Sequence, residues 1–340
     1  MIDPLDAILA RPRPDQDGMR DTIAALHALL PVRGDPKNAD EMLALLRMLY
    51  RIARRDLPLA RLFEGHSDAL QIVARYADPD IAAAAADAAD SGGAFGVWNA
   101  ALPDEPLRVE SGRLHGGKSF ASGAGILTHA LVGADTDEGQ RLLLVDLAAS
   151  APLIDRDWWR VVGMQRSQTH VVRWEGASAA SFAFVGAPGD YPREPWFSGG
   201  ALRFVACHAG GVAALFDRVR EHLVSTGRAD DPHQAGRLAD LYVAADAAAG
   251  AVRHAGRAWF ASETAEKIAH VAAARVAVAA IADRAIAIAE QAVGAQGMFV
   301  AHPLSTVLTD LMVYLRQPAP DAQRMRVGKA AAEAVLVPRL

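Results

Sequence analysis

The 340-residue chain is 51% hydrophobic and 22% charged, a composition that is ordinary for a folded globular protein and excludes a disordered one. Its length allows roughly two or three domains. With a formal net charge of -5 and a pI near 6.1 it offers no basic surface, so we expect neither nucleic acid nor a membrane as a partner.

Cysteine, histidine and terminal patterns exclude further classes. The single cysteine, Cys207, lies in an apolar run, which predicts a core thiol and excludes an internal disulfide. The 11 histidines show no metal-ligand spacing, so we expect no metal. The sequence begins without a basic stretch followed by an apolar run, and no segment has the roughly 18 uncharged apolar residues of a membrane span. We therefore expect a cytoplasmic protein.

From the start to about Asp90 the apolar residues recur at helical spacing, as in the run from Ile23 to Leu30. Asn38 precedes the next periodic stretch as a capping residue, and Pro58 is tolerated near the start of the one after it. Residues 1–90 are therefore predicted to form an N-terminal α-helical domain.

Between residues 91 and 187 turn residues separate short apolar segments, which is typical of β-strands. Asp135–Gly139 and Glu175–Gly176 have good turn chemistry. We predict a small β-barrel or β-sandwich domain over residues 91–187, ended by the proline-rich stretch Gly186–Pro195. Its strands are expected within residues 95–98, 129–132, 142–145, 171–174 and 182–185.

After Trp196 the sequence is alanine-rich and helical. Apolar residues from Val271 to Ala292 alternate at intervals of four and three, and Gly294 follows as a C-terminal cap. Such a seam of small residues packs closely against partner helices, within the subunit or between subunits. Residues 188–340 are predicted to form a C-terminal helical bundle, and the fold class is α+β with several domains.

Residues Gly112–Ser119 satisfy the phosphate-loop pattern G-x-x-x-x-G-K-S letter for letter. The pattern holds phosphates only where a buried strand enters the loop and a helix leaves it. Upstream, Leu107–Leu114 indicates a hairpin, and downstream Phe120–Gly125 has glycines where a helix would need helix formers. We therefore reject a nucleotide triphosphate site. The H-E-x-x-H, G-x-S-x-G and Rossmann patterns are absent from the sequence.

The order of helices, small β domain and helical bundle resembles the acyl-CoA dehydrogenase superfamily over nearly the whole chain. The stretch Gly-Lys-Ser-Phe-Ala-Ser ending at Ser122 is similar to a family strand whose aromatic and hydroxyl residues lie against the FAD ring. The resemblance implies these positions for Phe120 and Ser122, and makes Lys118 a turn residue. Ala94–Asn99 resembles the strand before the other flavin-facing loop, which implies that Trp98 and Asn99 lie by the flavin.

Other segments extend the resemblance. Residues 158–169 are similar to the family's Gly-Met-Arg-x-Ser-x-Thr element, and Trp174 stands at its later aromatic position. Gln291–Gly297 resembles the Gln-x-x-Gly-Gly-x-Gly turn, which in the family reaches the FAD of a neighbouring subunit. The resemblance thus implies FAD as cofactor and a homodimer or homotetramer. It also implies cofactor contacts from three residues of this turn, Gln291, Gly294 and Gly297. A further contact is implied for Arg228, a remnant of the family's Arg-x-x-Phe-Gly element.

One departure from the family concerns the general base. Family dehydrogenases use a carboxylate to remove a proton from the substrate, but the usual glutamate position is occupied by Pro318. The alternative location, Gly199–Arg203, contains no carboxylate either. Asp321 and Asp310 are the nearest carboxylates in sequence, and each is expected as a cap or surface charge.

Three functions remain open. The first is an FAD-dependent oxidoreductase that acts on an acyl thioester, such as acyl-CoA, or a related activated acyl substrate, with a non-standard or missing base. The second is a flavin-dependent monooxygenase of the same superfamily, which requires no carboxylate base and is favoured by the missing glutamate. The third is a degenerate, non-catalytic scaffold or partner-binding subunit, favoured by Ala295 at the turn's second glycine position.

Overall fold

The computed structural model describes residues 3–178 and 181–338. Contacts divide the chain into two compact units that alternate along the sequence. The first comprises Met1–Pro36, Arg61–Arg160 and Gln165–Arg193, and the second comprises Lys37–Ala60, Val161–Met164 and Glu194–Leu340. The predicted boundary after residue 187 lies near the change of unit after Arg193, and the division into three domains stays a prediction.

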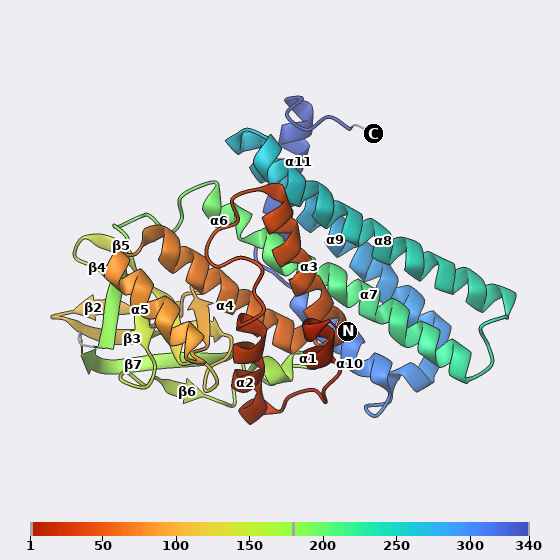
Figure 1. Ribbon diagram of the computed structural model, residues 1–340, viewed down its shortest axis with the longest axis horizontal. Helices are drawn as coiled ribbons and strands as arrows, with labels where there is room; N and C mark the ends of the chain where they lie inside the picture. Colours follow the sequence, from red (N-terminus) through yellow and green to blue (C-terminus); the bar gives the residue numbers. More distant parts are fainter. Residues whose placement is uncertain (1–2, 179–180, 339–340) are drawn as a thin grey trace. The chain divides into compact units, whose positions relative to one another are not determined.

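The helices of the first unit lie in the region where helical periodicity predicted them (Figure 1). They are α1 (Pro4–Leu9), α2 (Gln16–His27), α5 (Pro79–Asp90) and the greater part of α4 (Leu57–Tyr76), whose second residue is Pro58. Asp15 caps α2 by accepting a hydrogen bond from the Gly18 amide, a contact that satisfies one of the free N–H groups of the first turn.

The strands of the first unit form one eight-stranded sheet with the order β6-β7-β3-β2-β4-β5-β8, and β1 pairs with β4 in parallel. Each apolar segment that predicted a strand lies in one, so the predicted β region is confirmed. The strands are β1 (Phe95–Trp98), β2 (Arg108–Glu110), β3 (Arg113–Ala121), β4 (His129–Thr136), β5 (Gly139–Asp146), β6 (Leu153–Asp155), β7 (His170–Ser178) and β8 (Phe182–Val185).

The turn expected at Glu175–Gly176 was wrong, because β7 continues through it. Glu175 pairs with His115 and Ala177 pairs with Leu114, so Gly176 is an extra residue in the ladder with a φ of 87°. A glycine in this conformation is typical of a β-bulge, which a local sequence pattern does not distinguish from a turn.

The core of the first unit lies between α4, α5 and the sheet. It contains Ile72 and Val73 from α4, Ala85 from α5, and Phe95 and Leu131 from strands β1 and β4. The small alanines of α5 allow the helix to approach the strands closely, so a helix that consists mainly of alanine still closes the core.

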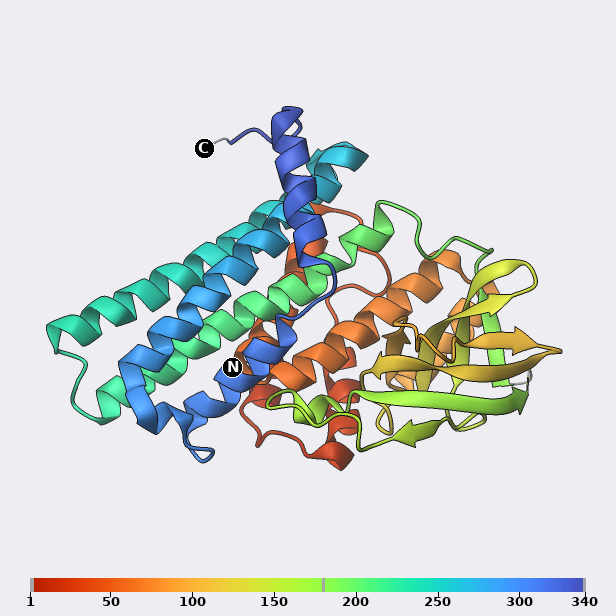
Figure 2. The same ribbon diagram turned by 180° about the vertical axis from the view of Figure 1, so that it is seen from behind.

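The second unit is a helical bundle in which α7 (Ala201–Ser225), α8 (Pro232–Ala261) and α9 (Thr264–Val293) run side by side (Figure 2). It also contains α3 (Ala39–Arg55), capped by Asn38 as predicted, α6 (Trp196–Gly199), η3 (Gly294–Met298), α10 (Pro303–Tyr314) and α11 (Pro320–Ala332). The predicted cap of α9 is confirmed at Gly294, whose φ is 73°.

Close packing of the bundle depends on small residues. A Cβ atom at Gly210 of α7 would lie 2.3 Å from the Tyr50 carbonyl oxygen of α3, so only glycine allows this approach of the two helices. Cys207 is fully buried on α7, as predicted for a core thiol. The segment Trp196–Ser225 is long and apolar enough to cross a membrane, but 83% of its most apolar window is buried inside the protein, as in a core helix.

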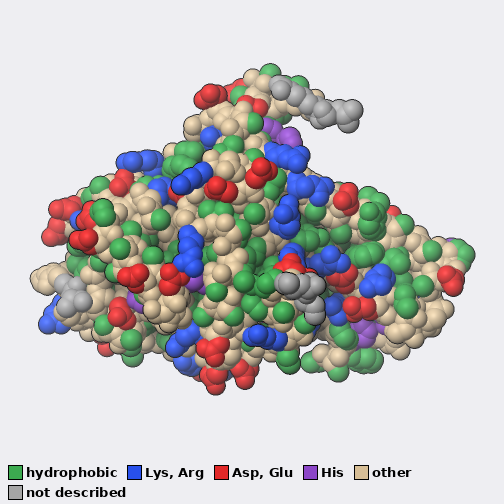
Figure 3. Space-filling model, in the orientation of Figure 1, with side chains coloured by type: hydrophobic (Ala, Val, Ile, Leu, Met, Phe, Trp, Pro, Cys, Tyr) green, Lys and Arg blue, Asp and Glu red, His purple; other side chains and the backbone are tan. Residues whose placement is uncertain are grey.

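On the face drawn in Figure 3, blue and red side chains are interspersed with hydrophobic ones. Several charged side chains of the protein form exposed ion pairs, such as Arg160 with Asp157, and pairs of this kind contribute little to stability.

A chain of hydrogen bonds joins α2, α4 and β1 inside the first unit. The Phe95 amide donates to Nδ1 of His66 (3.1 Å), so the hydrogen of this ring is on Nε2, which lies 2.9 Å from Nδ1 of His27. Nε2 of His27 then donates to Asp90 (3.1 Å), which also accepts from Arg33. Burial, with a smaller contribution from the neighbouring His27, lowers the pKa of His66 to about 3.

This chain makes the free energy of unfolding depend on pH. His66 stays neutral in the folded protein, whereas in the unfolded chain it takes up a proton below its ordinary value of 6.5. The unfolded state therefore gains stability as the pH falls, and lowering the pH from about 6.5 to about 5 is expected to reduce the free energy of unfolding by about 1.5 kcal/mol through His66 alone. Urea unfolding at a series of pH values measures this slope.

The matched variants are His66→Phe, which removes the titrating ring, and His115→Gln at an exposed position of β3. The slope is expected to decrease in the first and to persist in the second. A wild-type free energy of unfolding that does not change over this pH window would contradict the role of His66.

Candidate functional site

The end of β3 is irregular where the sequence predicted flavin-facing residues. Lys118 pairs with Val172 of β7, but the next pair is Ala121 with His170, so β3 contains one more residue than β7 between these pairs. Within this bulge Phe120 has a φ of 50°, a left-handed conformation that is rare for a bulky residue. Its ring is 55% exposed, while Ala121 beside it is fully buried. The bulge therefore turns one aromatic ring out of the sheet.

A line of three hydroxyl groups lies next to the bulge. Ser167, in the short helix η1 (Gln165–Ser167), is 2.8 Å from the Thr169 hydroxyl, which donates to Ser122 at 3.0 Å. Because Thr169 uses its hydrogen toward Ser122, Ser167 is the donor to Thr169. All three residues are buried, with Ser122 8% exposed. The hydrogen of the Ser122 hydroxyl has no acceptor within residues 3–178 and 181–338. The line thus ends in a free donor.

Several backbone contacts fix the loop that carries Ser122. Trp98 donates its indole N–H to the Ser122 carbonyl (2.8 Å), and the Gly123 amide donates to the Ser167 carbonyl (2.8 Å). Gly123 has a φ of 79°, and a Cβ there would lie 2.6 Å from Leu127. Gln168, the residue before Thr169, also has a left-handed φ of 44°. Backbone strain of this kind is found where function holds a residue in place.

The structure of β3 also shows that the phosphate-loop pattern does not form a phosphate site. No helix follows Ser119, since β3 continues to Ala121 and turns follow it, so the structure lacks the element that would hold phosphates. The expectation that Lys118 is a turn residue was wrong: it is 4% exposed within β3. Burial lowers the pKa of its ammonium group to about 8, and the charge of Asp135 offsets part of this effect.

The structure gives Trp98 and Asn99 different surroundings. Trp98 is 1% exposed, and its ring centroid lies 6.3 Å from that of Trp174, itself buried with its N–H donated to the Ser150 carbonyl. Its observed contacts hold the Ser122 loop. Asn99 is exposed after the end of β1, and its Oδ1 lies 2.9 Å from the position that a Cβ at Gly133 would occupy. Their contact with a flavin stays a prediction.

The residues predicted on the bundle lie at one end of it. Gln291 is exposed in the last turn of α9, and Gly294 and Gly297 lie in η3, which leads to α10. His302, which caps α10, lies 3.2 Å from His222 near the end of α7, and Arg228 follows that helix. Burial lowers the pKa of His222, and the charges of His302 and Arg228 lower it further. His302 at the start of α10 and Arg228 thus both lie close enough to affect His222.

None of the carboxylates considered as a base has an arrangement suited to that role. Pro318 precedes α11, and its carbonyl accepts a hydrogen bond from Arg275 (2.9 Å). Asp321 is exposed in the first turn of α11, as expected for a surface charge at a helix start. Asp310 was expected at a cap or on the surface, but it is 7% exposed and accepts the Met164 amide at 2.5 Å, so it anchors a loop of its own unit.

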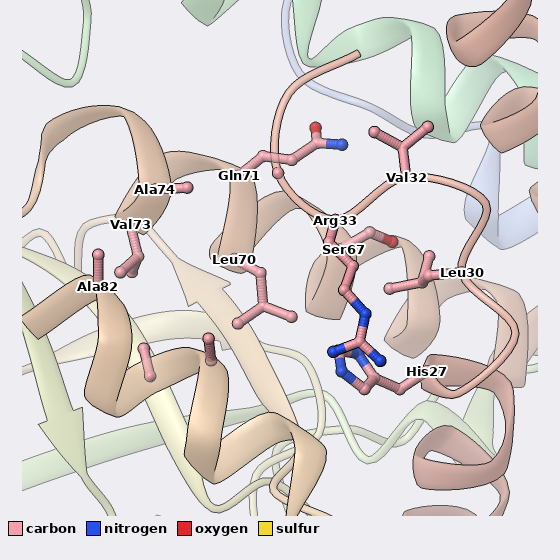
Figure 4. A pocket seen from close by; sticks show the side chains of 13 residues that line it. His27, Leu30, Val32, Arg33, Ser67, Leu70, Gln71, Val73, Ala74 and Ala82 are labelled. Atoms are coloured by element: carbon pink, nitrogen blue, oxygen red, sulfur yellow. The ribbon is translucent and has the colours of Figure 1, made fainter. Parts of the chain in front are cut away.

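The first unit also contains a cavity of about 180 Å³ between α4, α5 and the segment after α2 (Figure 4). Its wall is mostly apolar, with Leu30, Val32 and Leu70 among the lining residues, and the polar Arg33 and His27 lie together at one side. Both bind Asp90, so they are part of the hydrogen-bonded chain that includes His66. Among the described residues no group of three or more His, Cys, Asp or Glu side chains could hold a metal ion.

Sequence reasoning missed three residues near the bulge. Trp158 and Trp159 contact Phe120, and the Arg156 guanidinium lies against Gly125, whose added Cβ would be 2.9 Å from it. The available signal was the pair of adjacent tryptophans in a charged, turn-forming stretch, Asp155–Arg160, because exposed tryptophan is uncommon outside recognition surfaces.

No family model matches the sequence, and no curated protein matches it. Solved structures match its fold at low identity. Dibenzothiophene monooxygenase TdsC from Paenibacillus sp. A11-2 is 17% identical, with 93% of this chain and 90% of that chain covered and a TM-score of 0.74. KijD3 in complex with dTDP is 19% identical, with 97% and 95% covered and a TM-score of 0.77.

Glutaryl-CoA dehydrogenase from Mycobacterium smegmatis, in complex with FADH2, is 14% identical, with 98% and 94% covered and a TM-score of 0.78. Identities this low establish a shared fold. The chain therefore has the acyl-CoA dehydrogenase fold, and the predicted α+β class with its C-terminal helical bundle is confirmed.

Proposed function

We propose that this chain, which has the acyl-CoA dehydrogenase fold, is a flavin-dependent oxidoreductase with FAD as its cofactor. The observation that carries the proposal is the free hydroxyl donor of Ser122 beside the exposed ring of Phe120. Structures of the same fold contain FADH2 in glutaryl-CoA dehydrogenase and FMN in TdsC and KijD3, which supports a flavin here.

The residues at the bulge fit the chemistry of a flavin. Its tricyclic ring has a flat apolar face, and its edge has nitrogen and carbonyl acceptors. An exposed aromatic ring suits the face, and a buried hydroxyl that still has a free hydrogen suits an acceptor on the edge. A bound flavin supplies hydride acceptance or, once reduced, reactivity toward oxygen.

The protein's own groups position this chemistry. Thr169 and Ser167 orient the Ser122 hydroxyl, because each donates to the next member of the line. The Trp98 N–H and the Gly123 amide hold the backbone on both sides of Ser122. Rigid support of this kind reduces the reorganisation that a reaction needs at its donor groups. In the second unit, Arg228 would hold the negative charge of the FAD pyrophosphate, and Gln291, Gly294 and Gly297 would contact the cofactor of a neighbouring subunit.

The second candidate is a flavin-dependent monooxygenase, and the observation that favours it is the lack of a base. Pro318 occupies the usual glutamate position, Asp321 is exposed, and Asp310 is used by the Met164 amide. A reaction with oxygen at the flavin needs no carboxylate to remove an α-proton. TdsC, which has the same fold, is described as a monooxygenase. A scaffold without flavin is the outcome if the cofactor is absent.

The first prediction from the proposed function concerns flavin retention. Ser122→Ala removes the free donor, so the purified variant is expected to contain less flavin or to show a shifted visible spectrum, while its free energy of unfolding falls by only about 1 kcal/mol. Visible absorption, followed by identification of the released flavin, measures this and distinguishes FAD from FMN.

Ser119→Ala is the matched control, because Ser119, near the end of β3, is as buried as Ser122 and donates to the Ala101 carbonyl. It is expected to lose similar stability and to keep its flavin. Equal flavin content and unchanged spectra in both variants would count against the Ser122 site, and wild-type protein free of flavin would reject the proposed function.

The second prediction concerns the reaction. Anaerobic mixing with saturated acyl-CoA thioesters of short, medium and long chain is expected to leave the oxidised flavin spectrum unchanged, because loss of a general base slows proton removal by about 10²–10⁴-fold. Stopped-flow absorption measures the bleaching. Bleaching within seconds by any acyl-CoA would contradict this, and its loss in Asp321→Asn would then identify the displaced base.

The third prediction concerns assembly. Met298, Phe299 and Val300 are exposed apolar residues just before α10, next to the turn that resembles a subunit contact. We expect a homodimer or homotetramer in which this end of the bundle is covered. Light scattering at micromolar concentration measures the mass, and a value near the 36.0 kDa of one chain would rule this out.

We also propose a cytoplasmic location. The proposed function is that of a small-molecule enzyme, and the most apolar helical segment of the chain is buried inside the protein.

A further inference from the structure

We propose that the substrate is a planar aromatic compound that bears an anionic group, with its ring bound by Trp158 and Trp159 and its charge bound by Arg156. The inference deepens the proposed function and rests on it, since these residues adjoin the Phe120 bulge.

Phe120, Trp158 and Trp159 form an aromatic cluster. The Phe120 ring meets Trp158 edge to face, with centroids 4.8 Å apart and planes at 85°, and it meets Trp159 in the same way at 6.4 Å. The two indoles are nearly parallel, at 20° and 6.0 Å. Phe120 is 55% exposed and Trp158 is 38% exposed. The exposed ring surfaces of Phe120 and Trp158 are therefore suited to stack with the flat ring of a ligand.

The turn that carries Trp158 is fixed by local hydrogen bonds. The Trp158 amide donates to the Asp155 carbonyl (3.4 Å), and the Asp155 side chain accepts the Asp157 amide (3.2 Å). The Arg160 amide in turn donates to the Trp158 carbonyl (3.0 Å). Such contacts fix the backbone that carries Trp158 before a ligand arrives, which lowers the entropy cost of binding.

Arg156 is the second residue of the same turn. Its two terminal guanidinium nitrogens lie 2.9 and 3.3 Å from the Cβ position of Gly125, a residue with a φ of 87°, three residues after Ser122. Within residues 3–178 and 181–338 Arg156 has no hydrogen bond or ion pair, whereas Arg160 is paired with Asp157 at 2.6 Å. The positive charge of Arg156 acts on buried His170, whose pKa is lowered chiefly by burial and further by this charge.

These features together select the ligand. Stacked indoles recognise a flat ring more strongly than a flexible aliphatic chain, and a guanidinium with all its N–H groups available binds a carboxylate or phosphate with paired hydrogen bonds. The two groups lie two residues apart on one turn. An aromatic anion can therefore satisfy both at once, while a neutral aromatic or a saturated acid satisfies only one.

Isothermal titration calorimetry with three probes tests this on the purified holoprotein. The probes are 2-naphthoate, its neutral counterpart 2-naphthamide, and the saturated acid decalin-2-carboxylate. We expect 2-naphthoate to bind roughly 10–100-fold more tightly than either of the others, because each lacks one of the two interactions.

Variants assign the interactions to residues. Arg156→Gln is expected to remove the preference for 2-naphthoate over 2-naphthamide, and the control Arg160→Gln is expected to keep it, since Arg160 is already neutralised by Asp157. Trp158→Leu is expected to weaken 2-naphthoate by about tenfold, and Trp158→Phe to retain most of the affinity. Trp158→Phe preserves a ring in case the leucine variant does not fold.

Similar affinity for all three probes, or no heat of binding by any of them, overturns the proposal. So does a Trp158 variant that loses flavin while its affinity for 2-naphthoate is unchanged, because the indoles would then serve the cofactor. A protein without flavin that still prefers 2-naphthoate would reject the proposed function and retain this site. A flavoprotein without the preference would do the reverse.

Discussion

The pairing of β3 with β7 determines where Phe120 and Ser122 of the candidate site lie. Lys118 pairs with Val172 and Ala121 with His170, so an extra residue must leave the ladder between them. A slip of one residue turns all later side chains to the opposite face of a sheet. The bulge absorbs this slip: Phe120 turns outward, Ala121 returns to the core, and Ser122 comes level with Thr169. Without the bulge the strand would present neither the aromatic ring nor the aligned hydroxyl groups.

The elements could be predicted from the sequence because their signals are local. The apolar segments marked the strands, Asn38 and Gly294 marked helix ends, and the Phe120 to Ser122 stretch was recognised through its family resemblance. The contacts that complete the site are not local. Ser122 and Thr169 are 47 residues apart in sequence, and Asp310 reaches Met164 across 146 residues. The burial of Lys118 depends in the same way on strands that are distant in sequence. The residues Gly-Lys-Ser alone therefore do not distinguish a turn from a buried strand.

This chain has the fold of the acyl-CoA dehydrogenases, but neither carboxylate considered for the general base of their reaction is suited to that role. The acyl-CoA dehydrogenase fold is present over nearly the whole chain, yet Pro318, which the family resemblance aligns with the usual carboxylate, has no acidic group, and its carbonyl is held by Arg275. The next residue, Ala319, has a left-handed φ of 56°, so the backbone here is shaped by the start of α11. A fold provides the positions of residues, and the reaction depends on which groups occupy them. Here the chain keeps the exposed Phe120 ring and the free Ser122 donor, whereas neither Asp321 nor Asp310 has an arrangement suited to α-proton removal.

Two energetic costs lie close together on β3. A left-handed phenylalanine costs of the order of 1–2 kcal/mol relative to an ordinary conformation, and exposing its ring adds the loss of burial. Lys118, two residues earlier, has its pKa lowered to about 8 from an ordinary value of 10.5, which corresponds to a cost of the order of 3 kcal/mol for its charged form. Glycine in place of Phe120 would remove the first cost, and an apolar residue in place of Lys118 would remove the second. The sequence has neither, and the hydrogen-bonded line from Ser167 to Ser122 holds the strained segment in place. A strained residue such as Phe120, held by surrounding contacts beside the free hydroxyl donor of Ser122, is the arrangement expected at a ligand-binding site.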